Sequence, residues 1–589
     1  MNLRLPANDE CNDGVSRDEG SFDPDMRRPL ALSHILTNLG QSRTLNLSQF
    51  IREKLVLDAS RLSLFLLCAA SIILSLLLGG GTRSGFLSDA LLQIFTIPLL
   101  IVALSRIFDL TSHQAVLSPQ LACALAFCAA VVLVPLMQLI PLPPWIWTAL
   151  PGRKPETEVF DLLGWELPWM PISVSPYATW QSAMSIIPTS AVFIGTLLLG
   201  YRERRLLSIV VLAFGVFSVF VGLMQVAQGE ASSLRFFEFT NPTEAVGFFA
   251  NRNHFAALLY VLTLFAAAWA VQAASTAGSW WGRRNYQAAA IVPIVTSFTI
   301  LVVLVSAQAM ARSRAGLALT MIALFGAFAL AYDDRRSASR GAASRLLAVT
   351  ATLAVLLSVQ FALYRIMERF DSDPLQDARI PIARNTIEAA KAFLPLGAGV
   401  GTFAQVYGIY EKPKDTLINS YVNHAHDDVL EVLLETGIPG AILMFLFVAA
   451  WGFQCAELWR RGPAEGAEVD LALARAASIV VGLLMVHSFV DYPLRTGGMM
   501  AILAFTCALL SDPPESEVRR EADIARKRRV IVQAADPSST PSRPTALSTS
   551  KEKSFHRPQT IDWPEEWRDA GSPGASDNAP PKSDKSVND

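Results

Sequence analysis

Long runs of apolar residues dominate the chain, and shorter polar stretches separate them. About twelve runs are long enough to cross roughly 30 Å of hydrocarbon as helices of about 20 residues, a few only with flanking residues included. These predicted spans lie at 61–80, 86–105, 117–140, 178–200, 206–227, 253–274, 288–310, 315–332, 345–364, 438–458, 470–490 and 498–511. The pattern predicts an all-α, polytopic membrane protein with about twelve transmembrane helices.

Polar segments at the two ends divide the chain into three regions. Residues 1–60 lack the apolar core of a signal peptide, so we expect a cytoplasmic N-terminal segment. Residues 61–511 form the transmembrane region, and residues 512–589 are rich in Pro, Ser and charged residues, which predicts a disordered cytoplasmic tail. The arginine-rich loops "YRERR" (201–205) and "DDRRSASRGAASR" (333–345) fall on the same predicted side, as the positive-inside rule requires.

Two connections on the opposite, outer side are too long to be simple turns. Residues 141–177 are rich in Pro and Trp, which predicts a compact cap at the lipid interface. Residues 365–437 form a second loop of roughly 70 residues, a length that is usually functional or disordered, and its helical patterns predict an ordered, partly helical segment. Within it, "GAGVG" (397–401) predicts a tight turn, because no βαβ pattern surrounds it as a nucleotide site would require.

The composition agrees with a membrane protein. Apolar residues make up 52% of the chain and charged residues 17%, outside the usual range of soluble domains. The six cysteines have neither the spacing of a disulfide framework nor that of metal ligands.

Many ionisable residues gather in "NHAHDDVLEVLLETGIPG" (423–440), directly before an apolar run. Asp428 followed by Glu431 fits a capping box at the start of an amphipathic helix. We therefore assign both acids to a helix cap and a solvated face, an interpretation that extends to Glu435. It does not explain His426, which precedes the predicted cap.

Three further polar clusters lie at the same predicted membrane face. They are Asn251, Arg252, Asn253 and His254 in "GFFANRNHFAALL", Arg312 and Arg314 in "ARSRAGLAL", and His487 and Asp491 in "HSFVDYPLR", where the spacing of four predicts one helix face. Charges at the edge of a membrane span are costly and mark functional sites by default. A single arginine could instead reach a lipid phosphate, but three clusters at one face favour a site.

These segments resemble the superfamily of O-antigen ligases and O-antigen polymerases. The resemblance rests on "GFFANRNHFA", "SRAG", "PLGAGVGTFAQVY", "AHDDVLEVLLETGIPG" and "HSFVDYPL", in this order over roughly residues 180–510. The chain departs from the family at one position, because the family histidine is usually followed by Asn, whereas Asp427 follows His426 here.

The resemblance implies a glycosyltransferase of the bacterial inner membrane. Such an enzyme takes a saccharide from an undecaprenyl-diphosphate carrier on the periplasmic side and transfers it to lipid A core or to another growing glycan. It implies no metal, cofactor or nucleotide sugar, and no nucleic-acid partner. His426 would lie at the reacting centre and Arg252 and Arg314 would hold the diphosphate; the further substrate-binding candidates are Asn253, His254, Arg312, Asp427 and Asp491.

The chemistry of these residue types suits that reaction. Arginine stays protonated and offers paired donors to a diphosphate leaving group. A neutral imidazole at His426 can remove the proton of an attacking sugar hydroxyl, and Asp427 or Asp491 would orient it. Two other classes remain open, a transporter or flippase of lipid-linked saccharide and a structural partner in an assembly complex. The clustering of ionisable groups at one face, rather than at the bilayer midplane, favours the enzyme over the transporter.

Overall fold

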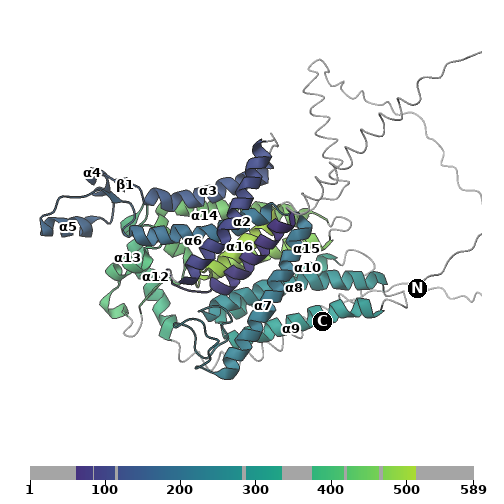
Figure 1. The fold of residues 1–589 in the computed structure, drawn as a ribbon. Helices are drawn as coiled ribbons and strands as arrows, with labels where there is room; N and C mark the ends of the chain where they lie inside the picture. The colour runs from purple at the N-terminus through teal and green to yellow at the C-terminus, as the bar shows by residue number, and fades with distance from the viewer. Residues whose placement is uncertain are drawn as a thin grey trace, which may run out of the picture. The chain divides into compact units, whose positions relative to one another are not determined.

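Long helices account for most of the chain. A computed structural model describes residues 61–83, 85, 87–112, 117–280, 287–334, 374–416, 421–462 and 468–511. The long helices are Arg61–Leu78, α2 (Leu87–Ser112), α3 (Pro119–Gln138), α6 (Pro176–Leu197), α7 (Tyr201–Gln228), α8 (Arg252–Trp280), α9 (Gln287–Ala311), α10 (Arg314–Asp334), α14 (Asp428–Arg460), α15 (Glu468–His487) and α16 (Gly497–Leu510) (Figure 1). Every predicted span within the described residues overlaps one of these helices. The predicted span at 345–364 and the two predicted terminal segments lie outside the described residues.

Seven of the described helices are long and apolar enough to cross a membrane. They are Arg61–Leu78, α2, α3, α7, the first part of α8 (Arg252–Ala273), α14 and α15, and shorter apolar helices lie at Val295–Ala311, Arg314–Leu330 and Gly497–Leu510. The chain is therefore an all-α, multi-pass membrane protein, and the number of twelve spans stays a prediction.

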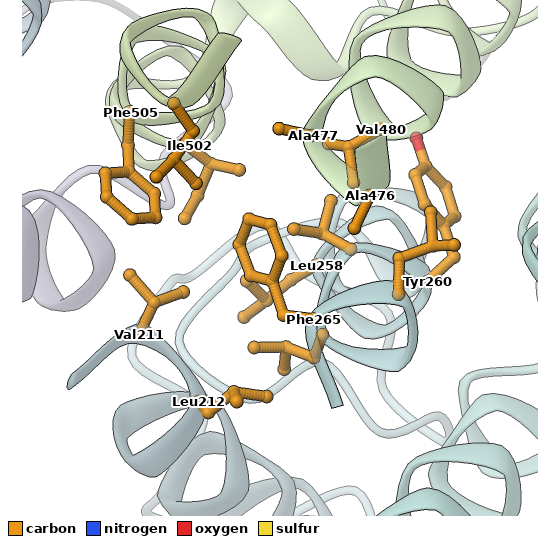
Figure 2. Close-up of a cluster of buried hydrophobic side chains, with 14 of the residues drawn as sticks. Val211, Leu212, Leu258, Tyr260, Phe265, Ala476, Ala477, Val480, Ile502 and Phe505 are labelled. Carbon is orange, nitrogen blue, oxygen red and sulfur yellow. The ribbon is translucent and has the colours of Figure 1, made fainter. Parts of the chain in front are cut away.

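Helix α8 is the centre of the transmembrane core. Its apolar window is 89% buried, whereas that of α3 is only 6% buried and leaves most of its surface for lipid. Helices α9, α10 and α15 pack on α8, and Figure 2 shows Leu258 and Phe265 of α8 among side chains of α7, α15 and α16. Small residues bring the helices together, since a Cβ placed on Gly316 would lie 2.4 Å from the Cβ of Ala256.

The two long connections that were predicted to lie outside the membrane fold at the same end of the helices. The first holds strand β1 (Pro141–Leu142), helices α4 (Pro144–Trp147) and α5 (Lys154–Leu163), and strand β2 (Met170–Pro171), which pairs antiparallel with β1. The second holds α12 (Pro374–Phe393), α13 (Phe403–Tyr410) and the 3-10 turn η1 (Pro413–Asp415) (Figure 1). The N–H of Val174 donates to the carbonyl of Ala398 at 2.8 Å and so joins the two connections. Helices α12 and α13 lie within the predicted loop 365–437, and the position of this loop outside the membrane stays a prediction.

A glycine turn fixes the second connection onto α14. Gly397, Gly399 and Gly401 all have positive φ, which confirms the predicted tight turn. α14 kinks at Gly437, where φ is 58°, and a Cβ at this position would lie 2.1 Å from the carbonyl oxygen of Pro395. Glycine is therefore required on both sides of a backbone-to-backbone contact, which holds the first turns of α14 at an angle to the membrane span that follows.

Candidate functional site

Asp427 fixes the position of His426 at the start of α14. The Oδ1 atom of Asp427 accepts hydrogen bonds from the N–H groups of Val429 at 2.9 Å and Leu430 at 3.0 Å, so Asp427 is the N-cap. The predicted capping box of Asp428 and Glu431 is wrong by one position. His426, directly before the cap, has φ 53°, a left-handed conformation that costs free energy outside glycine and is often found at functional sites.

The carboxylate of Asp491 holds His426. The Nδ1 atom of His426 lies 3.1 Å from Oδ1 of Asp491, and the side-chain amide of Asn253 donates to the other oxygen, Oδ2. Asp491 is fully buried. Burial by itself raises the pKa of this carboxyl, but the hydrogen bond from His426 and the electrostatic interactions with the neighbouring histidine rings outweigh burial and bring the pKa well below its usual range. Asp491, not Asp427, is therefore the residue that orients His426.

Asp491 does not share a helix face with His487, because α15 ends at His487. The expectation of one helix face is therefore wrong, since the chain turns at this point and the N–H of Asp491 donates to the carbonyl of His487 at 3.0 Å. His487 is buried inside the core, where its Nδ1 lies 3.3 Å from the hydroxyl of Tyr260. The turn therefore places Asp491 next to His426, whereas His487 stays in the core beside Tyr260.

Tyr492 packs against three histidines and was not predicted. Its ring centroid lies 4.3 Å from that of His424, 4.9 Å from that of His426 and 5.0 Å from that of His254. Burial raises the pKa of the Tyr492 hydroxyl, which therefore stays protonated. His254 is fully buried, and its two ring nitrogens have no hydrogen-bond partner among the described residues. His254 therefore lines the site through its ring contact with Tyr492.

His424 differs from His426 in what its ring contacts. Nδ1 of His424 lies 2.8 Å from a carboxylate oxygen of Glu431, and Nε2 lies 2.9 Å from the carbonyl oxygen of Thr82. Both partners accept hydrogen bonds, so both ring nitrogens must donate and the imidazole is a cation. Burial lowers the pKa of His424, but the negative charge of Glu431 and the hydrogen bonds to Glu431 and to the carbonyl of Thr82 together outweigh burial, and the result is a raised pKa. His424 has no lone pair available for catalysis.

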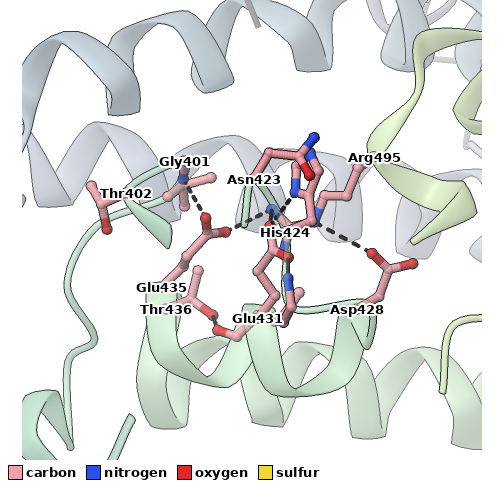
Figure 3. A network of polar contacts seen from close by, with 12 residues as sticks. Gly401, Thr402, Asn423, His424, Asp428, Glu431, Glu435, Thr436 and Arg495 are labelled. Carbon is pink, nitrogen blue, oxygen red and sulfur yellow. Dashed lines mark hydrogen bonds and ion pairs between the residues drawn. The ribbon is translucent and has the colours of Figure 1, made fainter. Parts of the chain in front are cut away.

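Three acids of α14 face inward and bind Arg495 (Figure 3). Asp428, Glu431 and Glu435 are 6%, 1% and 1% exposed, so the prediction of a solvated face is wrong. The guanidinium of Arg495 lies 2.7 Å from Glu435 and 3.4 Å from each of the other two carboxylates. The spacing of three and four residues places the acids on one helix face. This spacing was the feature of the sequence from which a shared partner could have been predicted. Arg495 was missed because it lies about 60 residues away in the chain.

The acid cluster joins four segments of the chain. The N–H of Gly401 donates to Glu435 at 2.9 Å, which fixes the glycine turn. The N–H of Ala425 donates to Glu431 at 2.8 Å, which fixes the segment 421–427 that carries both histidines. The hydroxyl of Ser488 donates to Asp428 at 2.7 Å, which fixes the turn after α15. The cluster therefore holds the two sides of the His426–Asp491 pair.

The two predicted phosphate-binding arginines each begin a helix. Arg252 starts α8, where its guanidinium lies 2.8 Å from the buried carboxylate of Glu244 and its N–H donates to the side chain of Asn241 at 2.8 Å. Arg314 starts α10, and the contact of Gly316 with Ala256 places the first turns of the two helices side by side. Arg312 is exposed and has a positive φ of 49°. The pairing of Arg252 with Glu244 was not predicted.

The polar groups at this end of the described helices are therefore arranged around one centre. Asp491 contacts His426 and accepts a hydrogen bond from Asn253, and His254 contacts Tyr492. The side chain of Asp427 instead caps α14, where it accepts hydrogen bonds from the N–H groups of Val429 and Leu430. Within the described residues, no group of three or more His, Cys, Asp or Glu side chains is placed to hold a metal ion.

Comparison with known proteins bears on these residues. No curated protein matches the chain significantly. Residues 299–445 match the family model described as O-Antigen ligase, a region that includes Arg312, Arg314, the glycine turn and His426. This match, over about a quarter of the chain, identifies an O-antigen ligase domain at residues 299–445 and supports the resemblance to O-antigen ligases and polymerases.

Proposed function

We propose that the protein transfers a saccharide from an undecaprenyl-diphosphate carrier to an acceptor glycan or lipid A core. The family supports glycosyltransferase activity in general. The observation that carries the proposal is the His426–Asp491 pair, which lies beside helix starts that bear arginines. The site then works at the periplasmic face of the bacterial inner membrane, without a metal or a nucleotide sugar.

His426 acts as the general base in this reaction. Its Nδ1–H donates to Asp491, so the lone pair is on Nε2, which has no hydrogen bond to a described residue. The acceptor hydroxyl oxygen attacks the anomeric carbon while its proton moves to Nε2. The bond from that carbon to the diphosphate oxygen breaks with its electron pair, and undecaprenyl diphosphate leaves. Asp491 stabilises the imidazolium that forms.

Arginines neutralise the leaving group. The diphosphate gains negative charge as the bond breaks, and guanidinium groups of Arg252 and Arg314 bind it through paired N–H donors. Glu244 already holds Arg252 in one orientation, which lowers the entropy lost when the phosphate binds. Asn253 keeps Asp491 in place, and His254 and Arg312 line the approach.

A transfer assay tests the proposal. The purified protein in detergent is given an undecaprenyl-diphosphate-linked oligosaccharide together with an acceptor glycan. We expect release of undecaprenyl diphosphate in step with extension of the acceptor. A transporter or flippase would bind the donor but release no diphosphate, and that outcome would rule out the enzyme. Deletion of the gene separates the two family activities, because loss of a ligase leaves unattached polymer, whereas loss of a polymerase leaves single repeats.

A further inference from the structure

A third arginine, Arg83, lies at the edge of the candidate site, where its guanidinium contacts two aromatic rings. It follows the helix Arg61–Leu78. Its guanidinium carbon lies 3.9 Å from the ring centroid of Phe239 and 4.9 Å from that of Tyr421. The two aromatic side chains are 57% and 58% exposed, so this cluster faces outward.

The two rings come from the two segments that build the site. Phe239 precedes Asn241, whose side chain accepts from the N–H of Arg252 at 2.8 Å. Tyr421 lies five positions before His426, on the segment that carries both histidines. Arg83 therefore contacts the arginine side and the histidine side of the site at once.

The turn before Arg83 is fixed to the same two segments. The carbonyl of Gly80 accepts from the N–H of Ala250 at 2.9 Å, next to the start of α8. The carbonyl of Thr82 accepts from Nε2 of His424 at 2.9 Å and from the side chain of Asn423 at 3.2 Å. The backbone is thus held by hydrogen bonds at Thr82, the residue directly before Arg83.

Both rings contact the guanidinium through cation–π interactions, which leave its N–H donors able to form hydrogen bonds. Arg83 forms no ion pair with a described carboxylate, so its planar fork of donors has no acidic partner among the described residues. Such a fork fits two oxygens of a phosphate, and stacking fixes its plane. We propose that Arg83 binds a phosphate group at the mouth of the site, as a third arginine beside Arg252 and Arg314.

This proposal rests on the proposed function in naming the carrier diphosphate as the expected source of the phosphate. A phospholipid headgroup presents the same chemistry at this depth. Binding is therefore measured with undecaprenyl diphosphate, first in detergent without phospholipid and then in vesicles of phosphatidylglycerol, so that the two sources are separated. The variants are Arg83→Gln, which removes the charge, and Arg83→Lys, which keeps the charge but loses the planar fork.

We expect Arg83→Gln to weaken binding of undecaprenyl diphosphate in detergent by about 10- to 100-fold, the range for a hydrogen bond to a charged group. Arg83→Lys should recover only part of that loss, and kcat should change less than the KM for the donor. The control is Arg202→Gln, since Arg202 is an exposed arginine at the start of α7, outside the site. It should bind as the wild type does.

Two outcomes decide the proposal. A loss that is seen only in the vesicles assigns the phosphate to a lipid headgroup. Equal binding by Arg83→Gln and the wild type in both media overturns the proposal, provided that thermal unfolding shows both proteins folded. Because binding is measured without turnover, this failure is distinct from failure of the proposed function, which appears as a wild type that binds but never transfers.

Discussion

At the scale of residues, two histidines only two positions apart have different chemistry because their partners differ. His424 meets two acceptors, Glu431 and the carbonyl of Thr82, and both its nitrogens donate. His426 meets one carboxylate, Asp491, and keeps one nitrogen for a substrate. The difference is set by what each ring faces and not by the local sequence, which is His-Ala-His.

Replacement of the base should remove catalysis without unfolding the protein. We expect His426→Ala to lower the rate of saccharide transfer by about 10²- to 10⁴-fold, the usual contribution of a general base. Donor binding and protein yield should stay near wild type, because the side chain is partly exposed and caps no helix. Steady-state transfer rates and donor binding are measured in parallel. Transfer at the wild-type rate by His426→Ala would place the base elsewhere.

His424 should affect stability in a pH-dependent way. Its pKa is raised in the folded protein, so its pairing with Glu431 contributes stability that is fully present below the ordinary histidine pKa of about 6.5 and is lost as pH rises through the raised value. The melting temperature of the wild type should therefore fall as the pH rises through this interval. The same decrease should be absent in His424→Gln. A slope that is unchanged in His424→Gln would contradict a cationic His424.

At the scale of elements, the acid face of α14 holds the turn that carries Asp491 and Tyr492. Arg495 ends that turn, in the 3-10 segment η2 (Pro493–Arg495), and its guanidinium reaches all three acids. Burial lowers the pKa of Arg495, but the carboxylates, Glu431 first, raise it further, so the charge is permanent. Since His426 precedes the same helix, the two residues of the proposed catalytic pair, His426 and Asp491, are joined through this cluster.

Loss of Arg495 should destabilise the protein and disturb catalysis together. We expect Arg495→Met to lower the free energy of unfolding by about 3–5 kcal/mol, because it leaves buried carboxylates unpaired. Arg495→Lys should fold but transfer more slowly, since an ammonium group cannot pair with all three carboxylates as the guanidinium does, and the turn that carries Asp491 is then held less firmly. The control is Arg204→Lys, a buried arginine that donates to the carbonyls of Ala508 and Ser511. It should lower the melting temperature and leave the transfer rate of the folded protein unchanged.

At the scale of the whole molecule, the described outer connections and the site residues belong to one end of the helix assembly. Gln138, at the end of α3, forms hydrogen bonds with Leu396, Val400 and Glu435. These bonds join α3 to the second connection and to α14. The exposed Trp145, Leu162, Trp165 and Trp169 of the first connection suit the predicted position at the lipid interface.

The orientation in the membrane can be tested by labelling. Arginine-rich loops predict that both termini and residues 333–345 are cytoplasmic, which places residues 365–437 outside. Engineered cysteines near Lys412 should react with a membrane-impermeant reagent in intact cells, and those near Ser337 should not. The reverse labelling pattern would invert the topology and remove the periplasmic site.

The sequence by itself determined the helices and the general location of the chemistry. Apolar run length is a local property, so the described helices follow the predicted spans, and the glycines of 397–401 specified a turn that few other residues could form. The grouping of His426 with Arg252 and Arg314 at one face followed from topology alone.

Only the tertiary structure decided which charges are paired, because their partners are distant in sequence. Asp491 lies 65 residues from His426 and Arg495 about 60 from Glu435, and no periodicity relates such positions. Acids spaced along one helix face are predicted to be solvated when no nearby cation is known. Here Arg495 pairs with them, and they form a buried cluster. Burial and pairing depend on how the helices pack around α8, and this packing fixed the roles of His424, His426 and Asp427.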